Sequence, residues 1–490
     1  MIRNVFLIGL MALLNFAAFG FAWAQAGAAA GDWSEAPASL RRVFEAHGIK
    51  REQAGIYVQA LDSEQPLFSA SPAAGFNPAS TIKLVTTWLA LSELGPNRTW
   101  PTEVYLDGTL DRGVLRGDLI IKGYGDPYLI TERLWALQRQ LRLRGLQRID
   151  GDLVIDNSYF AIEDTDPGAF DGEELRVYNV LPDALLVNFQ ALNLYFAPDR
   201  ARNNVRVFAD PMPANLSIEN RLRLKPGRCG GFRNGVTLEL QGGAARDRLV
   251  VSGDYGADCE LWSMSRSILT APSYAYGVFR SLWEESGGVL NGNYRVDLNA
   301  LARFPEDSEP FLVVESPPLG DIIRSINKYS NNVMSRHLFL TLGADAFGAP
   351  ATSAKSRKAA DLALRKQGLE STGIYLDNGS GLSRDARISA GDLASILRNA
   401  GNSPWFAEYV SSMSLAGLDG TLRKRFKAEP ATGRMHLKTG RLDGVYATAG
   451  YVHAASGRDY VVVILQNYPD ADRGPGEEAQ AALLRWIYEQ

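Results

Sequence analysis

The chain has 490 residues, enough for roughly two to four domains of ordinary size. Apolar residues make up 46% and charged residues 22%, which is typical of a globular protein, and the formal net charge of −4 argues against a nucleic-acid partner. Two cysteines and four scattered histidines, with no HExxH pair, exclude a cysteine-rich zinc site and disfavour a zinc peptidase.

The first 24 residues have the pattern of a secretory signal peptide. Arg3 precedes an apolar run that extends from Val5 to Phe21, and Ala22–Ala24 is a small-x-small cleavage motif. The alternative is an uncleaved membrane anchor, because the apolar run is near spanning length. We expect cleavage after Ala24, and hence an exported, periplasmic protein with no stable membrane span after processing.

Apolar periodicity predicts helices and a strand in the segment that follows. A helical pattern after Leu40 ends at Gly48, and Gly55–Leu61 is predicted to be a strand. After Pro78, apolar positions at helical spacing continue to Gly95, where a following proline ends the helix.

From about residue 100 to 300 the sequence is mostly strands and turns. Gly117–Ile121 is echoed by Gly151–Ile155, which predicts two similar strands. Between them lies a predicted helix whose arginines are most simply its solvated face. These arginines are Arg133, Arg139, Arg142 and Arg144.

The two cysteines lie in glycine-rich stretches of this middle region. Export to an oxidising compartment favours a disulfide between Cys229 and Cys259, closing a loop of about 30 residues. The alternative is two buried free thiols.

From about residue 305 onward helices dominate again. They are predicted at 319–342, 355–367, 389–399 and 474–488, with strands at 434–438, 445–452 and 460–466. We therefore expect the first and last parts of the chain to form one α/β unit that the β-rich middle interrupts.

A candidate nucleophile lies at the start of the helix after Pro78. Ser80–Lys83 is an SxxK motif, and one helical turn places the hydroxyl and the amine on the same face. A lysine with a lowered pKa can take the serine proton, and a helix N-terminus offers N–H groups to an oxyanion. The motif is weak alone, because Ser325–Lys328 matches it too.

Two further motifs follow in order. Ser330–Asn332 is an SxN between two apolar helical runs, and by itself it is typical of a helix cap. Lys438–Gly440 is a KTG at the end of a short strand, where Lys438 could attract a carboxylate, Thr439 could hydrogen-bond it, and Gly440 could let a ligand approach. SxxK, SxN and KTG in this order are the signature of penicillin-binding proteins and serine β-lactamases.

The chain resembles the class C low-molecular-mass penicillin-binding proteins, the D-alanyl-D-alanine carboxypeptidase/endopeptidase family. Ser80 and Ser330 are 250 residues apart, a gap that family members fill with inserted domains. Three stretches resemble the family's GGGDP, DGSGLSR and LAGxDGTL motifs: Gly123–Pro127, Asp377–Arg384 and Leu415–Leu422. The family's INKxSxN run fits Ile326–Asn332, and the order of motifs selects Ser80 over Ser325.

The resemblance implies an α/β fold, a penicillin-binding/serine β-lactamase-like transpeptidase domain with an antiparallel sheet flanked by helices. Residues 25–105 plus 305–490 would form this catalytic domain. A β-rich inserted region over 106–304, with two subdomains, would interrupt it.

The implied reaction is acyl transfer on peptidoglycan stem peptides. Ser80 would attack the carbonyl between the two terminal D-alanines with Lys83 as base, and Ser330, with Lys83, would pass the proton to the leaving amine. Asn332 would position the substrate amide. β-Lactam antibiotics would acylate the same serine, and no metal or cofactor is implied.

The resemblance also assigns substrate-binding roles. Lys438 and Thr439 would hold the terminal carboxylate, and the N–H groups of Ser80 and Arg441 would form the oxyanion hole. Relatives commonly have Ser or Thr at position 441, so Arg441 could strengthen carboxylate attraction or block the site.

A second departure from the family pattern is Asn378, which stands where the family usually has Asp. By resemblance, Arg384 would recognise the acidic end of a diaminopimelate-type side chain and Glu173 its amino group. The alternative for both residues is a surface ion pair.

Other functions fit less well. A class A β-lactamase needs a glutamate for deacylation, and no glutamate between SxN and KTG has an ExxLN context. Tyr329–Asn331 mimics the YxN motif of class C β-lactamases, but the large insert in this chain does not suit that class. A non-catalytic wall-binding protein would not need three intact motifs. A Ser-His-Asp hydrolase is disfavoured because no GxSxG is present.

Overall fold

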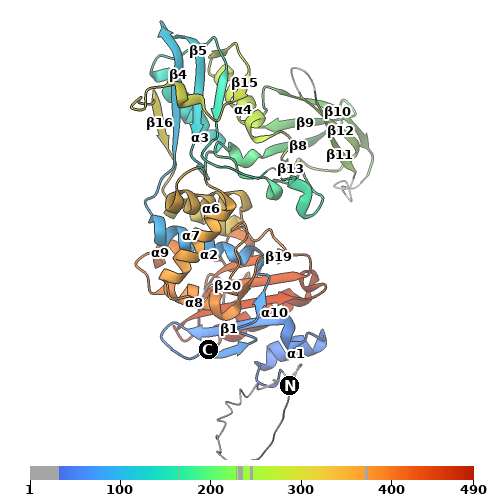
Figure 1. The fold of residues 1–490 in the computed structure, drawn as a ribbon. Helices are drawn as coiled ribbons and strands as arrows, with labels where there is room; N and C mark the ends of the chain where they lie inside the picture. Colours follow the sequence, from blue (N-terminus) through green and yellow to red (C-terminus); the bar gives the residue numbers. More distant parts are fainter. Residues whose placement is uncertain (1–32, 164, 228, 230–234, 243–246, 370–372) are drawn as a thin grey trace, which may run out of the picture.

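The computed structural model describes residues 33–163, 165–227, 229, 235–242, 247–369 and 373–490. Two bodies are stacked in Figure 1: the lower one holds both ends of the described chain, and the middle of the chain forms the upper one. The predicted signal peptide lies outside the described residues. Within those residues, none of the helices has the length and apolarity needed to cross a bilayer.

The lower body is built on a six-stranded antiparallel sheet with the strand order β18-β19-β20-β21-β1-β2. Its strands are β1 (Ala54–Ala60), β2 (Phe68–Ala70), β18 (Ser414–Leu415), β19 (Met435–Leu442), β20 (Val445–His453) and β21 (Asp459–Asn467). β21 is buried on both faces, which explains its nearly continuous apolar run. A separate pair joins β3 (Gly75–Phe76) to β17 (Ile388–Ser389).

Helices cover both faces of this sheet. One face packs against α1 (Ala38–Ala46) and α10 (Pro475–Tyr488). The other packs against a larger helical layer, which contains α2 (Lys83–Leu94), α5 (Leu319–Tyr329), α6 (Asn332–Phe347), α7 (Ser353–Lys366), α8 (Ala390–Gly401) and α9 (Phe406–Ser411). The two apolar clusters hold the sheet between them.

The upper body contains a seven-stranded mixed sheet. Its strands are β4 (Pro101–Asp111), β5 (Val114–Gly123), β6 (Arg148–Ile149), β7 (Leu153–Asp156), β14 (Val289–Leu290), β15 (Tyr294–Val296) and β16 (Leu312–Glu315). β4 and β5 form a hairpin whose two turn residues, Arg112 and Gly113, both have positive φ, the geometry that two-residue hairpin turns favour. α3 (Thr131–Leu143) and α4 (Ala271–Glu285) pack against each other and share one apolar cluster with this sheet.

Two three-stranded sheets complete the upper body. One is β13-β8-β9 and the other is β10-β12-β11. Their bounds are β8 (Leu192–Asp199), β9 (Asn204–Asp210), β10 (Leu216–Lys225), β11 (Val236–Gln241), β12 (Asp247–Gly256) and β13 (Trp262–Arg266).

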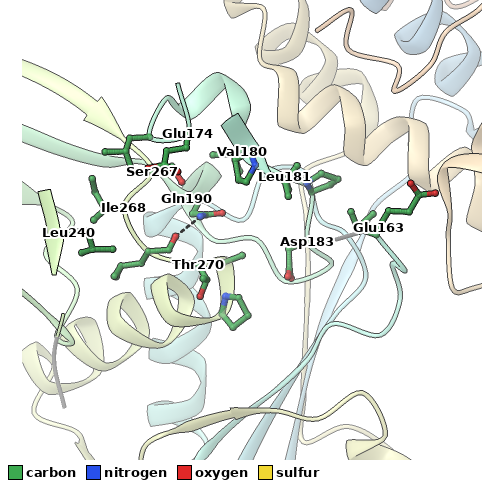
Figure 2. A pocket seen from close by; sticks show the side chains of 17 residues that line it. Glu163, Glu174, Val180, Leu181, Asp183, Gln190, Leu240, Ser267, Ile268 and Thr270 are labelled. Carbon is green, nitrogen blue, oxygen red and sulfur yellow. Dashed lines mark hydrogen bonds between the residues drawn. The ribbon is translucent and has the colours of Figure 1, made fainter. Parts of the chain in front are cut away.

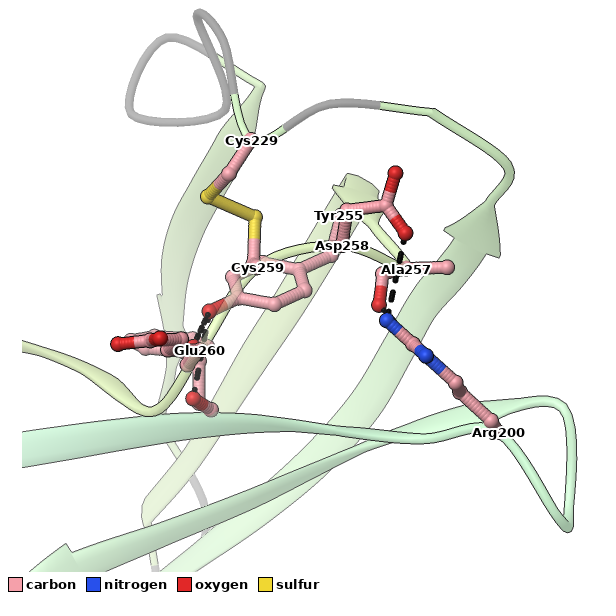
Figure 3. The surroundings of a disulfide bond; sticks show 8 residues. Arg200, Cys229, Tyr255, Ala257, Asp258, Cys259 and Glu260 are labelled. Carbon is pink, nitrogen blue, oxygen red and sulfur yellow. Dashed lines mark hydrogen bonds and ion pairs between the residues drawn. A yellow bond between two sulfur atoms is a disulfide. The ribbon is translucent and has the colours of Figure 1, made fainter.

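The predicted disulfide between Cys229 and Cys259 is present. It joins the segment after β10 to the segment after β12, two strands that pair in parallel. Figure 3 shows Arg200 reaching the same turn, where it donates to the carbonyl of Ala257 and contacts Asp258. The disulfide therefore closes one end of a small sheet in the upper body, with no side chain of the lower body involved.

The two echoed segments of the sequence are neighbouring strands. β5 and β7 pair in parallel, with Leu119 opposite Leu153 and Lys122 opposite Asp156. The intervening α3 is the crossover that a parallel pair requires.

The segment predicted as one helix over 319–342 is two helices. The prediction was wrong at Ser330, which has φ +58° and ends α5, while Asn331 caps α6 by accepting a hydrogen bond from the Met334 N–H. Apolar spacing continues through the break, so the pattern alone did not reveal it. β19 also extends four residues beyond the predicted end at 438, because it pairs with β20 through Leu442.

The division between the two bodies remains a proposal. We propose that the inserted region begins near β4 and ends near β16, a few residues outside the predicted 106–304. These strands pair antiparallel, with Pro101 opposite Glu315, so the two crossings between the bodies lie side by side.

Candidate active site

Ser80 lies in a 3₁₀ turn, Ala79–Ile82, that leads directly into α2. The preceding Ala79 is buried and has φ +44°, a strained conformation for a residue with a Cβ. Asn77 maintains this conformation: its Oδ1 accepts from the Ala79 N–H at 2.9 Å, and its backbone exchanges two hydrogen bonds with Asn467 at the end of β21. The candidate nucleophile is therefore fixed to the central sheet.

Lys83 is completely buried, and its amine lies 2.9 Å from Ser80 Oγ. Nζ donates to Asn332 Oδ1 at 2.7 Å and also to the carbonyl of Ser380. Burial holds the pKa of Lys83 well below its usual value, and the positive charges of Lys438 and Arg336 lower it further. In its neutral form the amine would have two N–H groups and one lone pair. With the N–H groups directed at the two acceptors, the lone pair would face Ser80.

Asn332 is the first residue of α6 and is held at both ends of its amide. Oδ1 accepts from Lys83, and Nδ2 donates to the backbone carbonyl of Tyr178 at 2.9 Å. Rotating the amide by 180° would lose both hydrogen bonds, so the two contacts fix its orientation. Tyr178 lies in the 3₁₀ turn Val177–Asn179, between β7 and β8, so this loop contributes directly to the site.

The Tyr178 loop is organised by one carboxylate. Asp171 accepts from the Tyr178 hydroxyl at 2.7 Å and from Asn179 Nδ2 at 2.8 Å. Its pKa is lowered, because these hydrogen bonds outweigh the effect of desolvation.

The KTG motif lies on β19 beside the Ser80 turn. Lys438 is completely buried and donates to Ser330 Oγ at 2.9 Å, and burial lowers its pKa to about 7. A Cβ on Gly440 would lie 2.7 Å from the Pro78 carbonyl and 3.0 Å from the Ser80 nitrogen. Only glycine allows β19 to approach the nucleophile this closely.

Thr439 connects the KTG motif to the segment Leu415–Leu422. Its hydroxyl donates to Thr421 Oγ1 at 2.9 Å, within Leu415–Leu422. In the same stretch, Asp419 forms an ion pair of 2.6 Å with Lys328. Lys328, the lysine of the second SxxK, is therefore engaged away from Ser325 and supports the 415–422 segment.

The loop 378–384 supplies the remaining wall of the site. Asn378 accepts from the backbone and hydroxyl of Ser380 and donates to the Leu382 carbonyl at 2.9 Å. Gly381 has φ +78°, and a Cβ there would collide with the Ala79 carbonyl. Asn378 shapes the loop that places the Ser380 carbonyl against Lys83; an aspartate would lack the donor that reaches Leu382.

Arg384 and Arg441 lie at the margins of the site. Arg384 stacks over Phe170 at 5.0 Å and donates to the Asp443 carbonyl. It lines a cavity of about 580 Å³ together with Arg336, Asp166 and Asp377. The Arg441 side chain is 65% exposed and pairs with Asp472 at 3.3 Å, which draws it toward the loop before α10.

Glu173 lies apart from this cavity. It forms an ion pair of 3.0 Å with Arg176 and is largely exposed. The structure therefore forms two neighbouring hydrogen-bonded groups, Ser80–Lys83–Asn332 and Ser330–Lys438, and the charge of Lys438 acts on Lys83. Arg384 lies at a neighbouring cavity, and Glu173 lies on the surface of the Tyr178 loop.

A second cavity of about 670 Å³ continues from the first. Both share the walls formed by Ile162, Glu163 and Leu181, and the second extends between this loop and the start of α4. Figure 2 shows Glu163 at the right and Ile268 at the left of this cavity, with the apolar side chains of Val180 and Leu181 between them.

Sequence reasoning missed three contributors to the site. The carbonyls of Tyr178 and Ser380 act through the backbone, so their side chains carry no signal. Arg336 lies one turn after Asn332 on α6, and only the fold shows that its charge acts on Lys83.

Comparison with known proteins gives consistent results. Residues 37–490 match the sequence profile of the D-Ala-D-Ala carboxypeptidase 3 (S13) family. The chain is 27% identical over 457 residues to a D-alanyl-D-alanine carboxypeptidase from an Actinomadura species, covering 91% of this chain and 83% of that relative.

Solved structures show the same fold. The crystal structure of penicillin binding protein 4 (dacB) from Haemophilus influenzae superimposes with a TM-score of 0.75 at 22% identity, covering 92% of this chain and 99% of that chain. A second structure of that protein, complexed with a β-lactam, gives a TM-score of 0.69 at 22% identity and covers 89% of this chain and 96% of that one. The predicted fold class is thereby confirmed.

Proposed function

The chain belongs to the D-Ala-D-Ala carboxypeptidase 3 (S13) family, and we propose that it hydrolyses the terminal D-Ala-D-Ala bond of peptidoglycan stem peptides through an acyl-enzyme on Ser80. The observation that carries the proposal is the buried Lys83, whose amine lies 2.9 Å from Ser80 Oγ while two other acceptors engage it. This is the arrangement of a serine activated by a general base.

Acylation begins with proton transfer from Ser80 to Lys83. Burial and the neighbouring positive charges lower the pKa of Lys83, which favours the neutral amine whose lone pair accepts the proton. Serine Oγ then attacks the carbonyl of the penultimate D-alanine. We infer that the N–H groups of Ser80 and Arg441 would stabilise the negative charge that develops on the oxygen. Gly440, the residue before Arg441, lies close to the Ser80 nitrogen, which supports this assignment.

Breakdown of the tetrahedral intermediate requires a proton for the leaving amine. Ser330 Oγ, which accepts a hydrogen bond from Lys438 at 2.9 Å, would pass to that amine the proton that Lys83 took from Ser80, so that Lys83 returns to its neutral form and Lys438 keeps its proton. The terminal D-alanine carboxylate would lie against Lys438 and Thr439, and its charge would raise the pKa of Lys438 while substrate is bound. Water then hydrolyses the acyl-enzyme.

Recognition of the stem peptide would take place in the cavity of about 580 Å³ beside the site. Arg384 and Arg336 at its wall would attract an acidic group on the side chain of the third residue, such as that of a diaminopimelate. Glu173, which forms an ion pair with Arg176, would act only after that pair opens.

Penicillin sensitivity and export follow from the same proposal. The Haemophilus influenzae protein of the same fold has been solved with a β-lactam, and we propose that this chain is acylated in the same way. The Cys229–Cys259 disulfide supports an oxidising, extracytoplasmic location, such as the periplasm.

Fluorescent penicillin labelling tests the proposal. We expect the purified protein to be labelled covalently, the Ser80→Ala variant to remain unlabelled, and the label to be lost slowly over hours. Turnover within seconds would indicate a β-lactamase, and absence of labelling in the native protein would contradict the enzyme. Digestion of crosslinked and uncrosslinked wall fragments then separates endopeptidase from carboxypeptidase activity.

A further inference from the structure

The exposed side of α3 carries arginines and aromatic surface that the proposed reaction does not use. Trp135 is 48% exposed and Leu143 75%. Arg139 lies over the Trp135 ring at 5.9 Å, and Arg142 lies over Trp283 at 5.5 Å. This arrangement differs from a simple solvated helix face, because both guanidinium groups lie over rings; the Trp135 ring is exposed, whereas the Trp283 ring is buried beneath Arg142.

The charge of this surface is not neutralised by the protein. α3 and the residue that follows it contain four arginines and one glutamate. Arg133 and Arg144 donate to the backbone carbonyls of Glu315 and Phe311. In the described part of the chain none of the four has a carboxylate within ion-pair distance, whereas the nearby Arg148 pairs with Asp150 at 2.6 Å.

Trp135 separates two hollows of different chemistry. The first, of about 510 Å³, offers amide and carboxylate groups from Glu132, Asn188, Asn193 and Asp210. Such groups match the hydroxyl and acetamido groups of sugars, which both donate and accept hydrogen bonds.

The second hollow, of about 330 Å³, is lined by Arg139, Arg142 and Ser286. Arg142 Nη1 is buried and has no acceptor among the described residues. A buried guanidinium N–H without an acceptor is unfavourable, and a carboxylate entering this hollow would satisfy it.

We propose that this surface, defined by Trp135, Arg139 and Arg142 with their two hollows, binds the peptidoglycan polymer. A sugar ring of the glycan strand packs on Trp135, and a stem-peptide carboxylate lies against the two arginines. The inference rests on the proposed function, since it takes the same polymer as the substrate. Nucleic acid is disfavoured, because Glu132 and Asp210 in the first hollow would repel phosphates.

The surface lies on α3 in the upper body, whereas Ser80 lies in the turn that precedes α2 in the lower body (Figure 1). It would therefore hold the enzyme on the wall while the active site processes nearby stem peptides. Hydrolysis of insoluble wall should depend on this surface, and hydrolysis of a short soluble peptide should not.

Cosedimentation of the penicillin-acylated protein with purified insoluble peptidoglycan tests the proposal, because acylation blocks binding at Ser80. We expect Trp135→Ala, and separately Arg139→Gln with Arg142→Gln, to weaken binding about tenfold, as removal of buried Trp or Arg contacts commonly does. The matched control is Arg221→Gln with Arg223→Gln on β10, which removes two charges from arginines that have carboxylate partners. The control should bind like the native protein.

Two outcomes would overturn the proposal. One is native-like cosedimentation of both α3 variants. The other is that polyglutamate inhibits binding to the insoluble wall as strongly as soluble wall fragments do at equal carboxylate concentration. That result would indicate a surface that binds anions without specificity. Penicillin labelling and thermal unfolding of each variant show whether it is folded, and cleavage of a soluble D-Ala-D-Ala peptide tests the proposed function independently.

Discussion

Replacing Asn332 with aspartate places a negative charge where Lys83 now has a neutral acceptor at 2.7 Å. At an effective dielectric constant of about 20, this pair is worth about 6 kcal/mol in favour of the protonated lysine. Desolvation of the new carboxylate opposes this, and we expect the pKa of Lys83 to rise by about 2–3. The protonated fraction of Lys83 then increases, and the protonated amine has no lone pair for Ser80.

The assay is the rate of acylation by a fluorescent β-lactam methyl ester between pH 6 and 10, since a free carboxylate would add the falling Lys438 limb near pH 7. Neutral Lys83 is the active form, so the rate rises with pH through the pKa of Lys83, and that limb should move about 2–3 pH higher in Asn332→Asp. At a pH below this limb the rate should fall about 100- to 1,000-fold. Asn332→Ala is the control, because it removes the same contacts without adding charge. An unshifted profile in Asn332→Asp would refute the assignment of Lys83 as base.

Three further predictions concern other parts of the structure. Protonated Lys438 binds the substrate carboxylate, so kcat/KM for D-Ala-D-Ala peptides should fall as pH rises above about 7. The rate of acylation by a β-lactam methyl ester, which lacks the carboxylate, should not show this fall. Gly440→Ala should slow acylation at least about 100-fold, because its Cβ displaces β19 from Ser80; labelling at the native rate would contradict the close approach. Cys229→Ser with Cys259→Ser should lower the unfolding free energy in urea by about 3–4 kcal/mol and leave penicillin labelling intact, whereas lost labelling would link the disulfide to the site.

Much of the fold follows from local patterns in the sequence. The strands and helices of the lower body show the expected periods, and the GDLII echo marks two strands that pair in parallel. The apolar spacing over 319–342 predicted one helix, because a left-handed residue ends α5 at Ser330 without interrupting that spacing; the Ser330–Asn332 motif, typical of a helix cap, was the signal of the break. Tertiary packing decides that position, not local preference.

The site was predictable where side chains carry the chemistry. Ser80, Lys83 and Lys438 stand in recognisable motifs, and the fold brings those motifs into hydrogen-bond contact. The carbonyl groups of Tyr178 and Ser380 could not be predicted, since any residue has a carbonyl and only the folded loops aim these two at Asn332 and Lys83. The positive φ of Ala79 could not be predicted either, because an alanine in the sequence gives no sign of a left-handed backbone conformation.

The central claim is an acyl-enzyme on Ser80, and mass spectrometry tests it most directly. The protein is incubated with benzylpenicillin, digested, and searched for the modified peptide, while release of D-alanine from a D-Ala-D-Ala peptide is measured in parallel. The account predicts one adduct, on Ser80, and loss of both adduct and D-alanine release in Ser80→Ala. An adduct on another serine such as Ser325, or D-alanine release by Ser80→Ala, would contradict it.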